Sequence, residues 1–140
     1  MKKKYLIIII GILIVLTGFT VYYLYGTNNE PDVAVGTEIG KKAPGFTLET
    51  PDNNKINLED LRGNRIFLNF WATWCPPCRQ EMPSIQKLHD NYREEDVKVI
   101  GVNIGESISK IDSFMDNNNY TLTVLADKNE KIAQKYLIRA

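Results

Sequence analysis

Two cysteines three residues apart are the residues of this chain best suited to chemistry. Cys75 and Cys78 enclose two prolines and are the only cysteines among 140 residues. An apolar run of strand length precedes the pair and a helical pattern follows it, which predicts a strand-to-helix junction. Residues three apart lie on one face of a helix, so the two thiols can form a small-ring disulfide.

The position of each cysteine predicts its role. Cys75 is expected at the helix N-terminus, where unpaired backbone N–H groups and the helix dipole stabilise the attacking thiolate. Cys78, one turn deeper, is then the resolving thiol that breaks a mixed disulfide between Cys75 and a substrate. Pro76 suits the first helical position because its missing N–H would have no helical partner there.

Glu81 is the next candidate for a site residue. It follows Cys78 by three residues and therefore shares the helix face of both cysteines. Its carboxylate could accept or return a proton during exchange, and its charge would disfavour a nearby thiolate. The alternative for a single glutamate is an ordinary solvated charge on a helix.

Three other interpretations of the cysteine pair are less favoured. Two buried free cysteines are not expected on the extracytoplasmic side of a membrane, where the domain is expected to lie. A structural disulfide that closes so small a loop would stabilise the fold only weakly. Zinc needs about four ligands, whereas the chain offers two cysteines and one histidine, His89, which we place on the helix surface without a role. We therefore expect redox chemistry at Cys75 and Cys78, with no metal and no other cofactor.

The elements around the cysteines predict an α/β fold. Alternating strands and helices indicate a mainly parallel central sheet flanked by helices. A hairpin over 46–48 and 55–57 and a helical turn over 58–61 precede the strand 66–71, which we expect to be buried on both faces. The further predicted elements are a helix from 76 to about 94–96, strands 97–103 and 121–125, and helices 107–117 and 130–136.

The N-terminal segment predicts a membrane anchor. Residues 6–25 carry no charge and are long enough to cross a bilayer as a helix. Three lysines, Lys2 to Lys4, precede the segment, so we expect a cytoplasmic N-terminus and an extracytoplasmic domain. The 17 basic and 17 acidic side chains leave the part after the segment slightly acidic, which argues against nucleic acid as a partner. The predicted divisions are an anchor at 1–25, a tether at 26–42 and a domain at 43–140.

Three stretches resemble the ResA/TlpA branch of the thioredoxin-like proteins. They are Ala43-Pro44-Gly45-Phe46-Thr47-Leu48, the run from Phe67 to Cys78 with Glu81-Met82-Pro83, and Val102-Asn103-Ile104-Gly105-Glu106-Ser107. The resemblance covers roughly residues 40–140. It implies a thioredoxin-like fold whose dithiol reduces the haem-binding cysteines of apocytochrome c and is itself reduced by a membrane thiol carrier of the CcdA type. On this analogy Cys75, Cys78 and Glu81 are the catalytic residues.

The sequence departs from that family in two places. It has Pro76-Pro77 between the cysteines, where ResA has Glu-Pro. It ends at Ala140, where the family continues into a cis-proline loop, a closing hairpin and a C-terminal helix, so we expect the last strands and helix to be missing and a sheet edge to be open. A membrane-anchored remnant, a metal chaperone and a thiol peroxidase are the alternative functions.

Overall fold

The computed structural model describes residues 2–26 and 33–139. The chain divides into two compact units, residues 1–34 and 35–140. Residues 27–32 of the expected tether lie outside the described residues. Part of the remaining tether has local structure, because a β-bridge joins Val35 to Lys42 and the Gly36 N–H donates to the Lys42 carbonyl oxygen at 3.0 Å.

The first unit is one apolar helix, α1 (Lys2–Gly26). Its segment Lys3–Tyr23 is 21 residues long, which at 1.5 Å per residue matches a hydrocarbon core about 30 Å thick. The hydroxyls of Thr17 and Thr20 each donate to a carbonyl oxygen one turn earlier at 2.9 Å, so both hydroxyls are satisfied within the helix. The helix is therefore compatible with a single-pass membrane anchor, as the sequence predicted.

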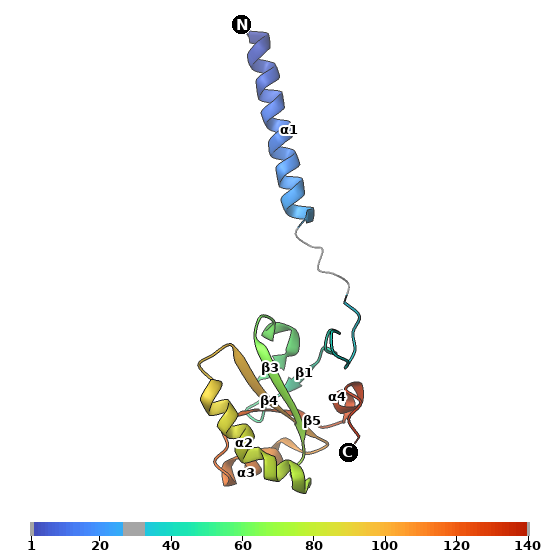
Figure 1. The fold of residues 1–140 in the computed structure, drawn as a ribbon, viewed down its shortest axis with the longest axis vertical. Helices are drawn as coiled ribbons and strands as arrows, with labels where there is room; N and C mark the ends of the chain where they lie inside the picture. Colours follow the sequence, from blue (N-terminus) through green and yellow to red (C-terminus); the bar gives the residue numbers. More distant parts are fainter. Residues whose placement is uncertain (1, 27–32, 140) are drawn as a thin grey trace. The chain divides into compact units, whose positions relative to one another are not determined.

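A mixed sheet forms the centre of the second unit (Figure 1). Its strand order is β2-β1-β5-β4-β3. The last three strands in this order run parallel, whereas β1 and β2 form an antiparallel hairpin and β1 pairs antiparallel with β5. The strands are β1 (Thr47–Glu49), β2 (Lys55–Asn57), β3 (Arg65–Trp71), β4 (Val97–Ile104) and β5 (Thr123–Asp127). The predicted α/β architecture is confirmed.

Helices α2 (Pro76–Tyr92) and α3 (Ile108–Asn117) pack on one face of the sheet (Figure 1). Alternate residues of β4 supply the two faces: Val99 enters the core under these helices, whereas Ile100 and Val102 enter the opposite core. The first core is completed by Trp71, Met82, Ile85, Ile111, Met115, Leu122, Val124 and Ala126. Phe46, Leu58, Leu125 and Ile132 complete the second, which lies under the 3-10 helix η1 (Leu58–Leu61) and α4 (Lys131–Lys135).

The prediction that strand 66–71 is buried on both faces is wrong. Strand β3 is an edge of the described sheet and pairs with β4 alone. Phe67 is consequently 42% exposed, and within β3 Trp71 is the one residue that is fully buried. A continuous apolar run reports strand length and burial tendency, but it does not distinguish a central strand from an edge strand.

The predicted element boundaries differ most from the structure in α2 and β5, and the others differ by at most one residue. Helix α2 ends at Tyr92, and β5 begins at Thr123 and continues to Asp127. The charged end of β5 is explained by its contacts, since Asp127 is buried and its Oδ2 accepts the backbone N–H groups of Ile132 at 2.9 Å and Ala133 at 2.8 Å. The side chain of Asp127 therefore stabilises the start of α4, although the residue itself ends β5.

Gly101 allows the indole of Trp71 to lie against the backbone of β4. A Cβ atom added at Gly101 would lie 2.9 Å from Nε1 and 3.3 Å from Cδ1 of that ring. Trp71 is 1% exposed and packs on Phe114 with ring centroids 5.2 Å apart, so the ring has no free space to enter. The glycine is therefore required by packing at the strand that leads to the cysteines.

We expect Gly101→Ala to lower the free energy of unfolding by about 1–3 kcal/mol, because the added methyl group overpacks the core. Urea unfolding of the full chain in detergent measures the change. Gly45→Ala is the matched control, since a Cβ there meets its nearest atom, Oε1 of Glu59, at 3.4 Å. Equal losses in the two variants would show that contact with Trp71 is not the cause.

Candidate functional site

The cysteines lie at the junction between β3 and α2. Trp71 ends the strand, a short loop follows, and Cys75 is the N-cap residue of the helix. Cys75 and Cys78 form a disulfide with their Cα atoms 5.3 Å apart. Both cysteines are half-buried, and Cys78 packs against the core that includes Trp71 and Met82. The structure thus brings together the two residues that the sequence singled out.

Backbone groups at the start of α2 determine the electrostatics around Cys75. Its Sγ accepts the N–H of Cys78 at 3.3 Å, and its carbonyl oxygen accepts the N–H of Arg79 at 3.1 Å. Pro76 and Pro77 occupy the first two helical positions and have no N–H to donate. The N–H of Cys78 is therefore the only donor that the first three helical residues can offer to the sulfur.

Glu81 lies one helical turn beyond Cys78, with its side chain exposed. Trp74, which immediately precedes Cys75, is 56% exposed, in contrast to the buried Trp71. The exposed indole and the exposed prolines therefore form the surface next to the disulfide.

A buried carboxylate, which sequence reasoning did not assign to the site, lies against the loop before Cys75. Glu106 follows β4, and its side chain is 3% exposed. Its Oε2 accepts the backbone N–H of Thr73 at 2.7 Å and Nδ2 of Asn103 at 2.8 Å. Its Oε1 accepts Oγ1 of Thr73 at 2.6 Å and pairs with Nζ of Lys110 at 2.6 Å.

These contacts keep Glu106 ionised. Burial alone would raise its pKa, but the contacts with Lys110, Thr73 and Asn103 outweigh burial and lower the pKa to about 2. The contacts also define the hydroxyl of Thr73 as a donor to Glu106. The only sequence signal for Glu106 is its place in the stretch 102–107, since a lone glutamate between a strand and a helix otherwise indicates a surface residue.

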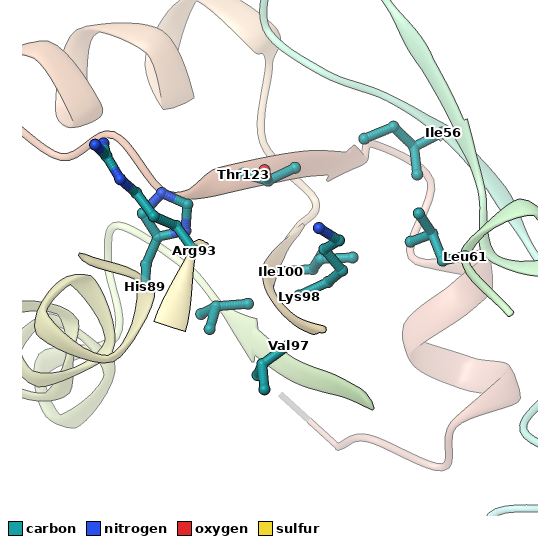
Figure 2. Close-up of a pocket in the computed structure, with 9 residues that line it drawn as sticks. Ile56, Leu61, His89, Arg93, Val97, Lys98, Ile100 and Thr123 are labelled. Atoms are coloured by element: carbon teal, nitrogen blue, oxygen red, sulfur yellow. The ribbon is translucent and has the colours of Figure 1, made fainter. Parts of the chain in front are cut away.

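His89 lies far along α2 from the cysteines. Figure 2 shows it with Arg93 at one side of a pocket of about 200 Å³, with Ile56 and Leu61 at the other side. Val97, Lys98 and Thr123 from the beginnings of β4 and β5 also line this pocket. The cysteines follow the opposite end of the sheet, so His89 is remote from them. Within residues 2–26 and 33–139 no three histidine, cysteine or acidic residues cluster as metal ligands.

Sequence comparisons place the chain among known proteins. A model of the AhpC/TSA family matches residues 39–140. Thiol-disulfide oxidoreductase ResA of Bacillus anthracis is 36% identical over 139 residues, which is 97% of this chain and 78% of ResA. Thioredoxin-like protein YneN of Bacillus subtilis is 40% identical over 131 residues, which is 91% of this chain and 74% of YneN.

Solved structures agree with these sequence matches. StoA from Bacillus subtilis superimposes with a TM-score of 0.59 at 26% identity, covering 68% of this chain and 72% of StoA. A secreted Mycobacterium tuberculosis disulfide oxidoreductase, homologous to DsbE of E. coli, superimposes with a TM-score of 0.59 at 27% identity, covering 65% of this chain and 66% of that one. The family match and the ResA relatives together show that the chain belongs to the AhpC/TSA family of thioredoxin-like proteins, in the group that includes the ResA thiol-disulfide oxidoreductases.

Proposed function

We propose that the chain reduces disulfides of extracytoplasmic proteins, with Cys75 as the nucleophile and Cys78 as the resolving thiol. The observation that carries the proposal is the Cys75–Cys78 disulfide at the N-cap of α2, where the Cys75 sulfur accepts a backbone N–H. That position stabilises a thiolate on the first cysteine, and the half-buried second cysteine lies within bonding distance of it.

The reaction proceeds by two exchanges. In the reduced protein the Cys75 thiolate attacks one sulfur of the substrate disulfide, and the other substrate sulfur leaves as a thiolate. Cys78 then loses its proton and attacks Sγ of Cys75, which releases the second substrate sulfur and forms the Cys75–Cys78 disulfide. Two electrons pass to the substrate. A separate donor dithiol must then reduce the Cys75–Cys78 disulfide with two further electrons before the next cycle.

The two prolines favour a reducing dithiol. A thiolate at a helix N-terminus is stabilised by the N–H groups of the first turn, and stronger stabilisation of the reduced form makes a dithiol more oxidising. Pro76 and Pro77 remove two of these donors and leave the N–H of Cys78, which lies 3.3 Å from the sulfur. The reduced state is consequently stabilised less than it would be beside a full set of donors, which suits an electron donor.

Glu81 is proposed as the group that takes the proton of Cys78. It lies on the next turn of α2, and its exposure gives the carboxylate direct exchange with solvent. General base assistance is needed at the resolving step, because Cys78 is half-buried and has to be deprotonated before it can attack.

The substrate and the electron donor are proposed from the relatives. We propose apocytochrome c, during cytochrome c maturation, as the substrate and a membrane thiol carrier of the CcdA type as the electron donor, as the resemblance to the ResA/TlpA branch implies. The ResA relatives, at 36% identity, support the thiol-disulfide exchange on which this proposal depends. A groove beside the disulfide offers a place for a peptide segment, since Pro76 and Arg79 of α2 line it together with Phe114 and Tyr120. A thiol peroxidase is less favoured, because its usual peroxidatic site has a threonine three residues before the cysteine. Here Thr73 lies two residues before Cys75, and its hydroxyl donates to Glu106.

Substitution of the two cysteines should separate their roles. We expect Cys75→Ser to abolish reduction of an oxidised apocytochrome c peptide by the full chain, because the nucleophile is lost. Cys78→Ser should instead accumulate a mixed disulfide through Cys75, visible on a non-reducing gel. A mixed disulfide that forms through Cys78 in Cys75→Ser would reverse the assignment. Sustained peroxide consumption by Cys78→Ser would favour the peroxidase alternative.

Glu81→Gln should slow the resolving step by roughly tenfold or more near neutral pH, because the proton acceptor is removed. The deficit should shrink at alkaline pH, where Cys78 ionises without help. Stopped-flow decay of a preformed mixed disulfide measures this step. Glu94→Gln is the matched control, since Glu94 is an exposed glutamate just beyond the far end of α2. If the decay rate of the mixed disulfide depends on pH in the same way in both variants, Glu81 is an ordinary solvated charge and not the proton acceptor.

The anchor and its orientation are also proposed. We expect the full chain to fractionate with membranes and to resist extraction by high salt or alkali, because the Lys3–Tyr23 segment crosses the bilayer. A membrane-impermeant maleimide added to intact, mildly reduced cells should label Cys75. Recovery of a shortened soluble form would contradict the anchor, and labelling only after lysis would contradict the extracytoplasmic domain.

A further inference from the structure

Glu106 contacts the loop that places Cys75 but has no part in the exchange described above. It meets both the backbone N–H and the hydroxyl of Thr73, two residues before the cysteine. Its other contacts are with Asn103 in β4 and Lys110 in α3. One carboxylate therefore joins the active-site loop to the neighbouring strand and to a second helix.

We propose that Glu106 is a positioning residue for the Cys75 thiolate, acting through the backbone of Thr73. This inference rests on the proposed function, because it concerns the cysteine assigned there as the nucleophile.

The prolines make the position of Cys75 critical. With Pro76 and Pro77 at the first two helical positions, the Cys75 sulfur depends on the single N–H of Cys78 at 3.3 Å. This hydrogen bond depends on the angle at its hydrogen atom and weakens when either residue moves out of line. Any loosening of the loop before Cys75 therefore lowers the stabilisation of the thiolate, with no second donor in that turn to replace the first.

The charge of Glu106 could act on Cys75 in the opposite sense. A carboxylate close to a thiol disfavours the thiolate, so its removal would increase the thiolate fraction. Lys110 lies 2.6 Å from Oε1, however, and balances this charge locally. We therefore expect the loss of positioning to exceed the loss of negative charge when Glu106 is replaced.

Alkylation of Cys75 tests the inference independently of substrate. In the full chain with Cys78→Ser, Cys75 is the only thiol, and its iodoacetamide reaction rate between pH 5 and 10 reports the thiolate fraction. Glu106 stays ionised throughout this range because its pKa is about 2. Adding Glu106→Gln should slow alkylation at neutral pH by roughly threefold or more and move the profile to higher pH.

Thr73→Val provides a milder second variant in case Glu106→Gln does not fold. It removes the hydroxyl donor and retains the backbone N–H, so alkylation should slow in the same direction by a smaller factor. Thr121→Val is the matched control, because its hydroxyl contacts Gln86 at 2.8 Å outside the Glu106 network. We expect the control to leave the profile unchanged.

Three results would overturn the inference. An unchanged profile in Glu106→Gln, even with a lowered melting temperature, would make the residue purely structural. Faster alkylation would show that its charge outweighs its positioning. If only Thr73→Val folds, an unchanged profile in that variant would be decisive. Failure of the reduced, unsubstituted chain to exchange with any disulfide would instead defeat the proposed function, and the alkylation profiles would still answer the question about Glu106.

Discussion

The parallel pairing of β3 with β4 determines where the chemistry of this molecule can lie. The strands pair over seven consecutive positions, from Arg65 with Val97 to Trp71 with Asn103. Because parallel strands place their carboxyl ends at the same edge of the sheet, the loop after Trp71 and the loop after Ile104 emerge side by side. The first loop carries Thr73 and leads into Cys75 at the start of α2, and the second carries Glu106. A shift of this register by one residue would separate Thr73 from Glu106 and turn Trp71 out of the core.

Much of this arrangement could be predicted from local sequence. The spacing of Cys75 and Cys78, the apolar run before them and the helical pattern after them specify the junction without tertiary information, and the structure has both cysteines there. The hairpin before β3 follows from turn-forming residues in the same way. These signals come from residues close together in the sequence, so they can be interpreted without knowing which strands are neighbours in the sheet.

The missed features depend on contacts between distant residues. Thr73 and Glu106 are 33 residues apart and meet only because β3 and β4 pair. The exposure of Phe67 depends on strand order, which an apolar run does not encode. Asp127 is buried at the end of β5 because α4 begins just beyond it and donates two N–H groups. In each case the burial of the residue is decided by a neighbour that is distant in the sequence or belongs to another element, which local rules do not identify.

The thiolate of Cys75 is stabilised by the start of α2, but other features of the same helix limit or oppose this stabilisation. The start of α2 favours negative charge on Cys75, but two prolines limit that effect to one N–H group, and Glu81 adds a carboxylate on the same helix. Under the proposed reducing function, we expect a site built in this way to stabilise its reduced form only moderately, which suits a donor of electrons more than an oxidant. It also makes reactivity depend on small displacements, since the sulfur has a single backbone donor. Under the positioning role that we propose for Glu106, the geometry of the sheet acts on this reactivity through the contacts of Glu106 with Thr73.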